Sequence, residues 1–254
     1  MSQARKIEAF RSASRGGAVR GMRSVHGHLA TTVAIARRGF DFIYLDQQHG
    51  LVTTEGVAAV VACLEPYDVA VLVRVASQSP VAIGQALDAG AHGVIIPDIE
   101  DEEQAARAVA ATRYPPAGRR SWGSFDMHGD GYAAGVLDGP HPLVFPMIES
   151  PTGVENVAEI AALDGVDGLY VGRFDLALTM GVGDDLIGKP GPHSDSIKVI
   201  RRACDHNGIP MATSGRQAAL MEQGYRMLTL GSELDLILAG LDAVLAEEKA
   251  SDGR

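Results

Sequence analysis

Four polar residues that could act together each follow a short apolar stretch of strand length: His49, Arg74, Glu149 and Asp175. Glu149 ends the apolar run 143–148, and Asp175 comes one strand-then-helix unit later, after the run 168–172. Because α/β folds place their chemistry at the carboxyl edge of the strands, we expect these side chains to meet at one edge.

Two carboxylates on neighbouring strands, with positions left open for water and substrate, suit Mg²⁺ or Mn²⁺, which prefer oxygen ligands. A cation held by Glu149 and Asp175 would bind an α-keto acid and stabilise the enolate left when a carbon–carbon bond breaks. Arg74 would add positive charge at the enolate oxygen, and His49 would accept a hydroxyl proton, directly or through water. A short helix that begins near Phe174 would offer backbone N–H groups to a carboxylate.

Each of these residues also has an ordinary structural explanation. A single loop histidine such as His49 is most often solvated, and Arg74 could form an ion pair with an acid of a neighbouring loop. Glu149 and Asp175 could stabilise the N-termini of the helices that follow them. The occurrence of all four at one edge of one barrel favours the chemical interpretation.

The composition narrows the class of protein. The chain has 254 residues and a formal net charge of -10, and one (β/α)₈ barrel typically takes ~250 residues. An acidic surface repels nucleic acid and anionic membranes, so we expect neither as a partner. Cys63 and Cys204 lack metal-binding spacing and are predicted to be buried thiols in a reducing compartment. No apolar run is long enough to cross a bilayer, and residues 1–20 lack the apolar core of a secretory signal, so a cytoplasmic protein is expected.

Strand-like and helix-like segments alternate through the chain as eight units, which predicts one α/β domain over 1–254. A helix or arm at 1–16 is expected to cap the barrel, and a helix at 233–249 to end it. The long connection 113–142 interrupts the rhythm and is predicted to be functional or mobile. Strands are predicted at 18–22, 42–46, 69–74, 93–97, 143–148, 167–171, 209–212 and 226–230.

Several short motifs are spread over most of the predicted barrel. They are 39–46 with His49 and Gly50, 73–75, 87–91, 111–116 with Gly118, Arg120 and Gly123, 148–150, and 171–172 with Asp175 and Leu176. Together they resemble the HpcH/HpaI aldolases, metal-dependent (class II) pyruvate aldolases that include the 2-keto-3-deoxy sugar acid and 4-hydroxy-2-oxo-heptanedioate aldolases. The resemblance covers about residues 39–231 and implies a (β/α)₈ TIM barrel of the phosphoenolpyruvate/pyruvate type.

The resemblance also implies roles for individual residues. It makes Glu149 and Asp175 the metal ligands, His49 the general base and Arg74 the group that stabilises the transition state. The substrate pocket would be formed by Met147, Gly172, Phe174 and Asp175, with the main chain of the last two holding the pyruvyl carboxylate. The implied cofactor is Mg²⁺, Mn²⁺ or Co²⁺, and the implied assembly is a homo-hexamer, a trimer of dimers in which the helix 233–249 packs on or is swapped with a neighbour.

One implied catalytic residue fits the predicted topology poorly. Asp88 matches an acid that raises the basicity of the histidine in the family, but it lies at the far end of a predicted helix, away from His49 of the same chain. Either a neighbouring subunit supplies Asp88, or the assignment is wrong here and Asp46, which is closer in sequence, takes that part.

Departures from the family pattern surround the expected site. Gln48 stands where the family usually has Glu, Met147 where it has Gln, and Ser121 where Gly is common. Arg173 and Phe174 replace a proline and a small residue, which adds bulk and charge beside the carboxylate pocket. We therefore expect the metal and enolate machinery to be retained and the acceptor pocket to be changed.

Two functions of different classes follow from this pattern. The first is an aldolase that cleaves 4-hydroxy-2-keto acids to pyruvate and an aldehyde, or runs the reverse addition; a related enolate condensation or decarboxylation is a variant of it. The second is a non-catalytic barrel that binds keto acids. The joint presence of His49, Arg74, Glu149 and Asp175 favours the first, and the sequence does not identify the aldehyde.

Overall fold

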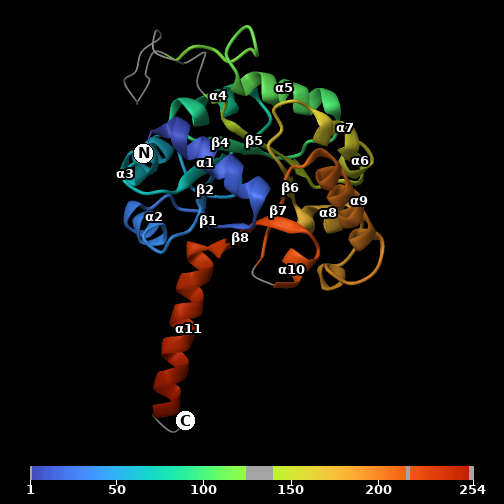
Figure 1. Ribbon diagram of the computed structural model, residues 1–254. Coiled ribbons are helices and arrows are strands. Elements are labelled where there is room, and N and C mark those ends of the chain that lie inside the picture. Colours follow the sequence, from blue (N-terminus) through green and yellow to red (C-terminus); the bar gives the residue numbers. More distant parts are fainter. Residues whose placement is uncertain (1, 124–139, 216–217, 252–254) are drawn as a thin grey trace.

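The computed structural model describes residues 2–123, 140–215 and 218–251 of the chain. Eight parallel strands follow one another in chain order around a closed barrel, and helices surround it (Figure 1). This confirms the predicted (β/α)₈ barrel. The strands are β1 (Val19–Ser24), β2 (Phe42–Asp46), β3 (Ala70–Arg74), β4 (Gly93–Ile96), β5 (Leu143–Ile148), β6 (Leu169–Val171), β7 (Met211–Ser214) and β8 (Tyr225–Ser232).

Helices alternate with these strands, as the hydrophobic pattern predicts. They are α1 (Gln3–Gly16), α2 (Leu29–Ala36), α3 (Thr54–Leu64), α4 (Pro80–Asp88), α5 (Glu102–Thr112), α6 (Pro151–Glu155), α7 (Val157–Ala162), α8 (Arg173–Thr179), the 3₁₀ turn η1 (Asp184–Leu186), α9 (Pro192–Asn207), α10 (Ala218–Glu222) and α11 (Glu233–Ser251). The helical segment that follows β5 is divided into α6 and α7 at Asn156, whose φ of -98° and ψ of 9° leave the helical region. Most of the connection predicted at 113–142 lies outside the described residues.

Two apolar layers hold the barrel together. One fills the space between strands and helices, and the other fills the barrel interior. Because both faces of each strand are covered, the strands β2 to β5 are buried at every position, as in parallel sheets generally. Helix α1 closes the amino end, where its Phe10 belongs to the interior cluster and packs edge-on against Phe42 at 5.7 Å between ring centroids.

Register brings the polar strand ends to one level of the barrel. Leu143, Phe145 and Met147 belong to the interior cluster, so the alternation along β5 continues inward to Glu149. Asp46 and Arg74, the last residues of β2 and β3, are direct register partners. Asp46, Arg74 and Glu149 therefore all lie at the carboxyl end of the barrel.

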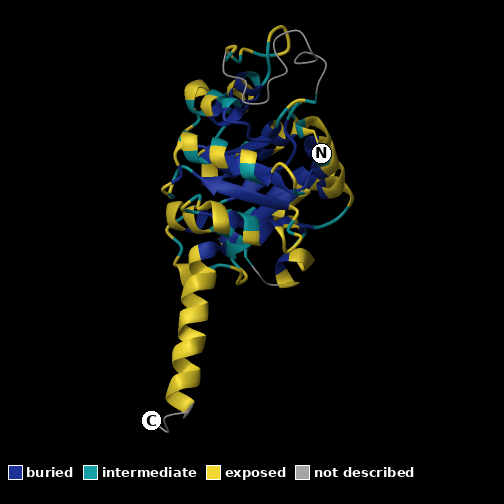
Figure 2. Ribbon diagram, turned by 90° about the vertical axis from the view of Figure 1, so that its left-hand side faces the viewer, coloured by how far each residue is buried: buried dark blue, intermediate teal, exposed yellow. Residues whose placement is uncertain are grey.

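The last helix leaves the barrel instead of packing along it. In Figures 1 and 2, α11 projects away from the other helices and is exposed along its length. Its start is fixed because Glu233 is buried and accepts hydrogen bonds from the backbone of Val25 and His26, at 2.8 and 2.9 Å. The exposed apolar side chains of the helix are Leu234, Leu236, Ile237, Leu238, Leu241, Val244 and Leu245.

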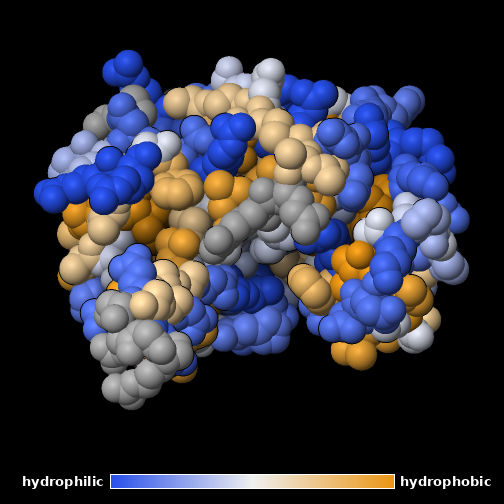
Figure 3. All heavy atoms as spheres, turned by 90° about the horizontal axis from the view of Figure 1, so that it is seen from below, coloured by the Kyte–Doolittle hydropathy of each residue, from blue (hydrophilic) through white to orange (hydrophobic). Residues whose placement is uncertain are grey.

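Figure 3 views the molecule from the side toward which α11 projects, and apolar surface lies there in several patches between polar side chains. Within the described ranges, no helix combines the length and apolar character needed to cross a membrane.

Candidate active site

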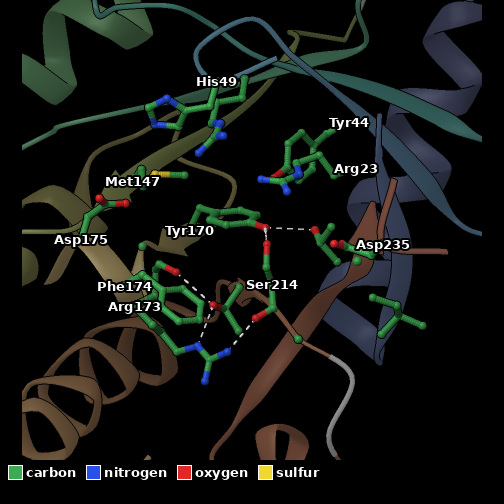
Figure 4. Close-up of a pocket in the computed structure, with 18 residues that line it drawn as sticks. Arg23, Tyr44, His49, Met147, Tyr170, Arg173, Phe174, Asp175, Ser214 and Asp235 are labelled. Atoms are coloured by element: carbon green, nitrogen blue, oxygen red, sulfur yellow. Dashed lines mark hydrogen bonds between the residues drawn. The ribbon is translucent and has the colours of Figure 1, made fainter. Parts of the chain in front are cut away.

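A cavity of about 600 Å³ opens at the carboxyl end of the barrel. Its walls come from the ends of β1, β2, β3, β5, β6, β7 and β8 and from the first turn of α8. Of the residues expected to do chemistry, His49, Arg74, Met147, Gly172, Phe174 and Asp175 line it (Figure 4).

The cationic part of the site is a buried ion pair between β2 and β3. Arg74 donates from Nε to Asp46 Oδ1 at 2.9 Å and from Nη2 to Oδ2 at 2.5 Å. Burial alone would raise the pKa of the Asp46 carboxyl, but the Arg74 hydrogen bonds and charge outweigh it and hold that pKa below its usual value. Arg74 Nη1 makes no hydrogen bond to any described residue, and Arg74 is one of the residues that line the cavity.

His49 is held beside this pair through its backbone. Asp46 Oδ1 accepts the N–H groups of Gln48 and His49 at 3.1 and 3.2 Å. A side chain at Gly50 would place a Cβ 2.2 Å from the Asp46 carbonyl oxygen, so the turn that carries the histidine depends on glycine there. Asp46 therefore positions the His49 loop and orients Arg74; no hydrogen bond joins its carboxylate to the imidazole in the described part of the chain.

Asp88 lies at the end of α4, away from His49. It accepts a hydrogen bond from Arg120 Nη2 at 2.7 Å, and the Arg120 guanidinium stacks over Tyr114 at 4.7 Å from the ring centroid. Asp88 is therefore already paired with Arg120 of the same chain. A role beside His49 would need the Asp88 of a neighbouring subunit.

Glu149 is buried without an ion pair to any described residue. Its Oε1 accepts the N–H of Asp98 at 2.7 Å, and Asp98 adopts a left-handed φ of 59° to present it. Burial, with a smaller contribution from the negative charge of Asp175, raises the Glu149 pKa to about 7 against the opposing Asp98 hydrogen bond. A Cβ at Gly172 would lie 2.5 Å from Glu149 Oε2, so this approach of α8 to the carboxylate requires glycine.

Asp175 lies in the first turn of α8, whose N-terminus opens toward the cavity. The N–H of Leu176 is the first to bond back along the helix, to the Gly172 carbonyl at 2.8 Å. The amides of Arg173, Phe174 and Asp175 belong to the first turn, where a helix has no internal acceptors. An anion bound there would meet backbone donors and the positive end of the helix dipole.

The two carboxylates fit a divalent cation that keeps open positions. Glu149 and Asp175 interact electrostatically, and the described residues contain no group of three or more His, Cys, Asp or Glu that could hold a metal. Mg²⁺ is commonly held by one or two carboxylates with water and substrate completing its coordination. A buried carboxylate without a cationic partner, next to a second carboxylate, suits that mode of binding.

A cluster of hydroxyl groups that the sequence did not predict also lines the cavity. Tyr170 Oη lies 2.8 Å from Ser214 Oγ and donates to Thr229 Oγ1 at 3.0 Å. Burial raises the pKa of Tyr170, so it is a neutral donor. The two-residue alternation along β8 could have indicated Thr229. Met227 is an interior residue, and Thr229, two positions later, faces the same side of the strand.

Arg23 on β1 was also missed, and the same alternation could have found it. Its register partner on β2 is Tyr44, an interior residue, so Arg23 points inward and lines the cavity. Arg173, a departure from the family pattern, lines the cavity as well. It donates from Nε to Thr213 Oγ1 at 3.2 Å and from Nη2 to the Ser214 carbonyl at 2.7 Å.

Comparison with known proteins gives the same family as the motifs. The sequence model of the HpcH/HpaI aldolase/citrate lyase family matches residues 24–239. A 4-hydroxy-2-oxovalerate aldolase of Novosphingobium aromaticivorans is 30% identical, over 97% of this chain and 93% of that protein. A 5-keto-4-deoxy-D-glucarate aldolase of Salmonella arizonae is 34% identical, over 83% of this chain and 84% of that protein.

A solved structure agrees over the whole fold. An HpcH/HpaI aldolase/citrate lyase family protein from Burkholderia cenocepacia superposes with a TM-score of 0.85 at 27% identity, covering 98% of this chain and 100% of that one. The motifs, the barrel and the family match are mutually consistent. The chain belongs to the HpcH/HpaI aldolase/citrate lyase family.

Proposed function

We propose that the protein is a divalent-metal-dependent aldolase that cleaves 4-hydroxy-2-keto acids to pyruvate and an aldehyde, or runs the reverse addition. Relatives that are named as aldolases of 2-oxo and keto-deoxy acids support an aldolase function with a small keto acid and an aldehyde as reactants. The observation that carries the proposal is the pair Glu149 and Asp175, one buried and without a described ion pair, beside the cavity that Arg74 and His49 line.

The residues divide the reaction between them. The first-turn amides of α8, at Phe174 and Asp175, would bind the carboxylate of the keto acid. His49 would take the proton of the C4 hydroxyl as the C3–C4 bond breaks, so that C4 leaves as the aldehyde carbonyl. The electron pair of that bond passes to C3, and negative charge develops on the C2 oxygen, which Arg74 Nη1 would stabilise. Protonation of this enolate at C3, by water or by the protonated His49, then gives pyruvate.

Glu149 and Asp175 would hold the divalent cation. When bound, it would supply Lewis acidity to the keto group. Gly172 keeps that side of the cavity free of a side chain, because a Cβ there would collide with the Glu149 carboxylate. Met147, which is 2% exposed, adds an apolar side chain to the wall of the cavity.

The direct test is exchange of the pyruvate methyl protons with D₂O, followed by NMR. We expect exchange that a chelator abolishes and that Mg²⁺, Mn²⁺ or Co²⁺ restores. A non-catalytic keto-acid-binding barrel would bind pyruvate without exchange. The chain has four lysines, Lys6, Lys189, Lys198 and Lys249, and none is among the described residues that line the cavity. Inactivation by borohydride in the presence of pyruvate would therefore contradict the proposal.

We also propose that the protein is a homo-oligomer in which α11 packs on a neighbouring subunit. The support is the exposed apolar surface of α11, on which Ile237, Leu241 and Leu245 are 51%, 55% and 57% exposed. The test is sedimentation of the unaltered chain and of a variant with Ile237, Leu241 and Leu245 all changed to Glu. The sedimenting mass should be lower for the variant. A monomer at micromolar concentration for the unaltered chain would exclude this assembly.

A further inference from the structure

The Glu149 carboxylate has different neighbours at its two oxygens. Oε1 accepts the backbone N–H of Asp98 at 2.7 Å. Oε2 lies on the side of Gly172, where a Cβ would come within 2.5 Å of it. Gly172 leads into α8, whose first turn carries Asp175. One oxygen of Glu149 is therefore held by the loop after β4, and the other faces the helix that carries the second carboxylate.

Asp98 donates this hydrogen bond from an unusual backbone conformation. Its φ of 59° is the one positive value among the described residues other than glycine. Such a φ is tolerated best by glycine, asparagine and aspartate, and it is a clear outlier for β-branched residues. The Asp98 carbonyl accepts a hydrogen bond from Gln78 Nε2, which helps to hold the peptide in this conformation. Backbone strain that the surrounding structure maintains in this way is typical of functional sites.

The loop after β4 is bonded to the chain on either side of Glu149. The Ile99 N–H donates to the Met147 carbonyl at 3.2 Å, and Ser150 Oγ donates to Glu100 Oε1 at 2.7 Å. These contacts fix the loop relative to the backbone that carries the glutamate. The backbone conformation within the loop then decides where its free N–H groups point.

We propose that Asp98 is a positioning residue for the divalent cation. Its left-handed backbone directs an N–H at Glu149 Oε1, which leaves Oε2 turned toward Asp175 and the metal. This inference rests on the proposed function, because it takes Glu149 and Asp175 as the metal ligands. The described residues contain no group of three or more His, Cys, Asp or Glu that could hold a metal, so the Asp98 carboxylate is assigned no ligand role.

The test is Mn²⁺ binding, measured by calorimetry, in variants that separate the backbone of Asp98 from its side chain. Asp98→Gly and Asp98→Asn remove the charge and keep access to a left-handed φ. Asp98→Val removes the same charge, but its β-branched side chain disfavours that φ. Asp98→Ala, a milder form of the same change, takes its place if Asp98→Val does not fold. The control is Asp205→Val, at an exposed aspartate of α9.

We expect Asp98→Gly and Asp98→Asn to bind Mn²⁺ within about 3-fold of the unaltered protein, because the charge that they remove is exposed and screened by solvent. Asp98→Val should bind it about 10-fold or more weakly, the usual worth of a hydrogen bond to a charged group. Asp205→Val should bind it as the unaltered protein does.

Two results would overturn the inference. The first is equal Mn²⁺ affinity in Asp98→Val and Asp98→Gly, even if Asp98→Val melts at a lower temperature, because the strained backbone would then serve stability alone. The second is a loss in Asp98→Gly and Asp98→Asn as large as the loss in Asp98→Val, which would make the Asp98 carboxylate itself a ligand.

The pyruvate exchange assay separates this inference from the proposed function. Methyl exchange in the unaltered protein, with equal Mn²⁺ affinity in Asp98→Val and Asp98→Gly, would reject the role of Asp98 and leave the aldolase proposal standing. A Mn²⁺ affinity that Asp98→Val reduces and Asp98→Gly retains, in a protein that shows no exchange, would support the role of Asp98 and reject the aldolase proposal.

Discussion

Asp46 and Glu149 are both buried carboxylates at the carboxyl end of the same barrel, with 0% and 8% exposure. Their proton affinities are shifted in opposite directions. Asp46 is paired with Arg74 and has a lowered pKa, whereas Glu149 has one backbone donor, a nearby carboxylate and a pKa raised to about 7.

The difference shows where the protein compensates charge and where it does not. On the side of β2 and β3, the cost of burying the Asp46 carboxylate is offset within the chain by an arginine. On the side of β5 and β6, the described residues offer Glu149 no cation at hydrogen-bonding distance. A buried ion without a partner destabilises the fold, so retention of Glu149 is explained if a cation from solution completes the pair.

His49→Ala should give the largest effect. It removes the proposed base, which lies beside the Asp46–Arg74 ion pair, and leaves Glu149 and Asp175 in place. Aldol cleavage should therefore fall by roughly 10²–10⁴-fold. Binding of metal and keto acid should persist, because neither depends on the imidazole. Steady-state kinetics and calorimetry on the same preparation measure the two quantities. Loss of keto-acid binding together with activity would show that His49 is structural.

Asp46→Asn should break the compensated pair. It leaves the Arg74 guanidinium buried without an anion, which typically costs about 3–5 kcal/mol in the free energy of unfolding. Urea denaturation at pH 7 measures the loss. Because the pKa of Asp46 is lowered in the folded protein, its stabilising effect is complete above the unfolded pKa and declines as the pH falls through the folded value. The difference between the two proteins should therefore narrow below about pH 4.

Arg74→Lys should separate catalysis from structure on this same side. Lysine keeps the charge but lacks the planar fork that binds Asp46 with two donors and leaves Nη1 for the substrate. If Nη1 acts on charge that develops in the transition state, turnover should fall by roughly 10²–10³-fold, with less change in apparent substrate affinity. Thermal unfolding is measured beside the rate. A destabilised protein with full turnover per folded molecule would reduce Arg74 to an ion-pair partner of Asp46.

Glu149→Gln should change the free energy of unfolding less than Asp46→Asn does, and should increase it. The amide keeps an acceptor for the Asp98 N–H and removes a poorly solvated charge, so the metal-free protein should gain about 1–3 kcal/mol at pH 8. The same change should abolish stabilisation of the protein by added Mn²⁺. Glu159→Gln is a matched control, because that glutamate is an exposed residue of α7. Destabilisation by Glu149→Gln would mean that the protein does compensate this carboxylate.

Much of the fold and part of the site could be predicted from the sequence. Apolar runs that end in Arg74 and Glu149 identify buried strands because parallel strands are covered on both faces. Chain order then places their ends at one edge. The bond of Asp46 to Arg74 could not be predicted, because it depends on a register that spans 28 residues of chain.

Other features depend on contacts that are distant in sequence. The two-residue alternation along their strands indicates that Arg23 and Tyr170 face inward, but that both line one cavity follows only from closure of the barrel. The partner of Asp88 is Arg120, 32 residues away in the chain. The apolar pattern of α11 predicted a helix but not its direction, since the same pattern fits a helix on its own barrel or on a neighbour.

The exposed apolar surface of α11 has a consequence for how the protein behaves on dilution. If that surface is covered in the folded state by another copy of the chain, assembly and folding are linked by mass action. The melting temperature would then rise with protein concentration, and dilution alone would favour dissociation and unfolding. Comparisons of variants would need equal subunit concentration, because a change in α11 and a tenfold dilution would shift the same equilibrium.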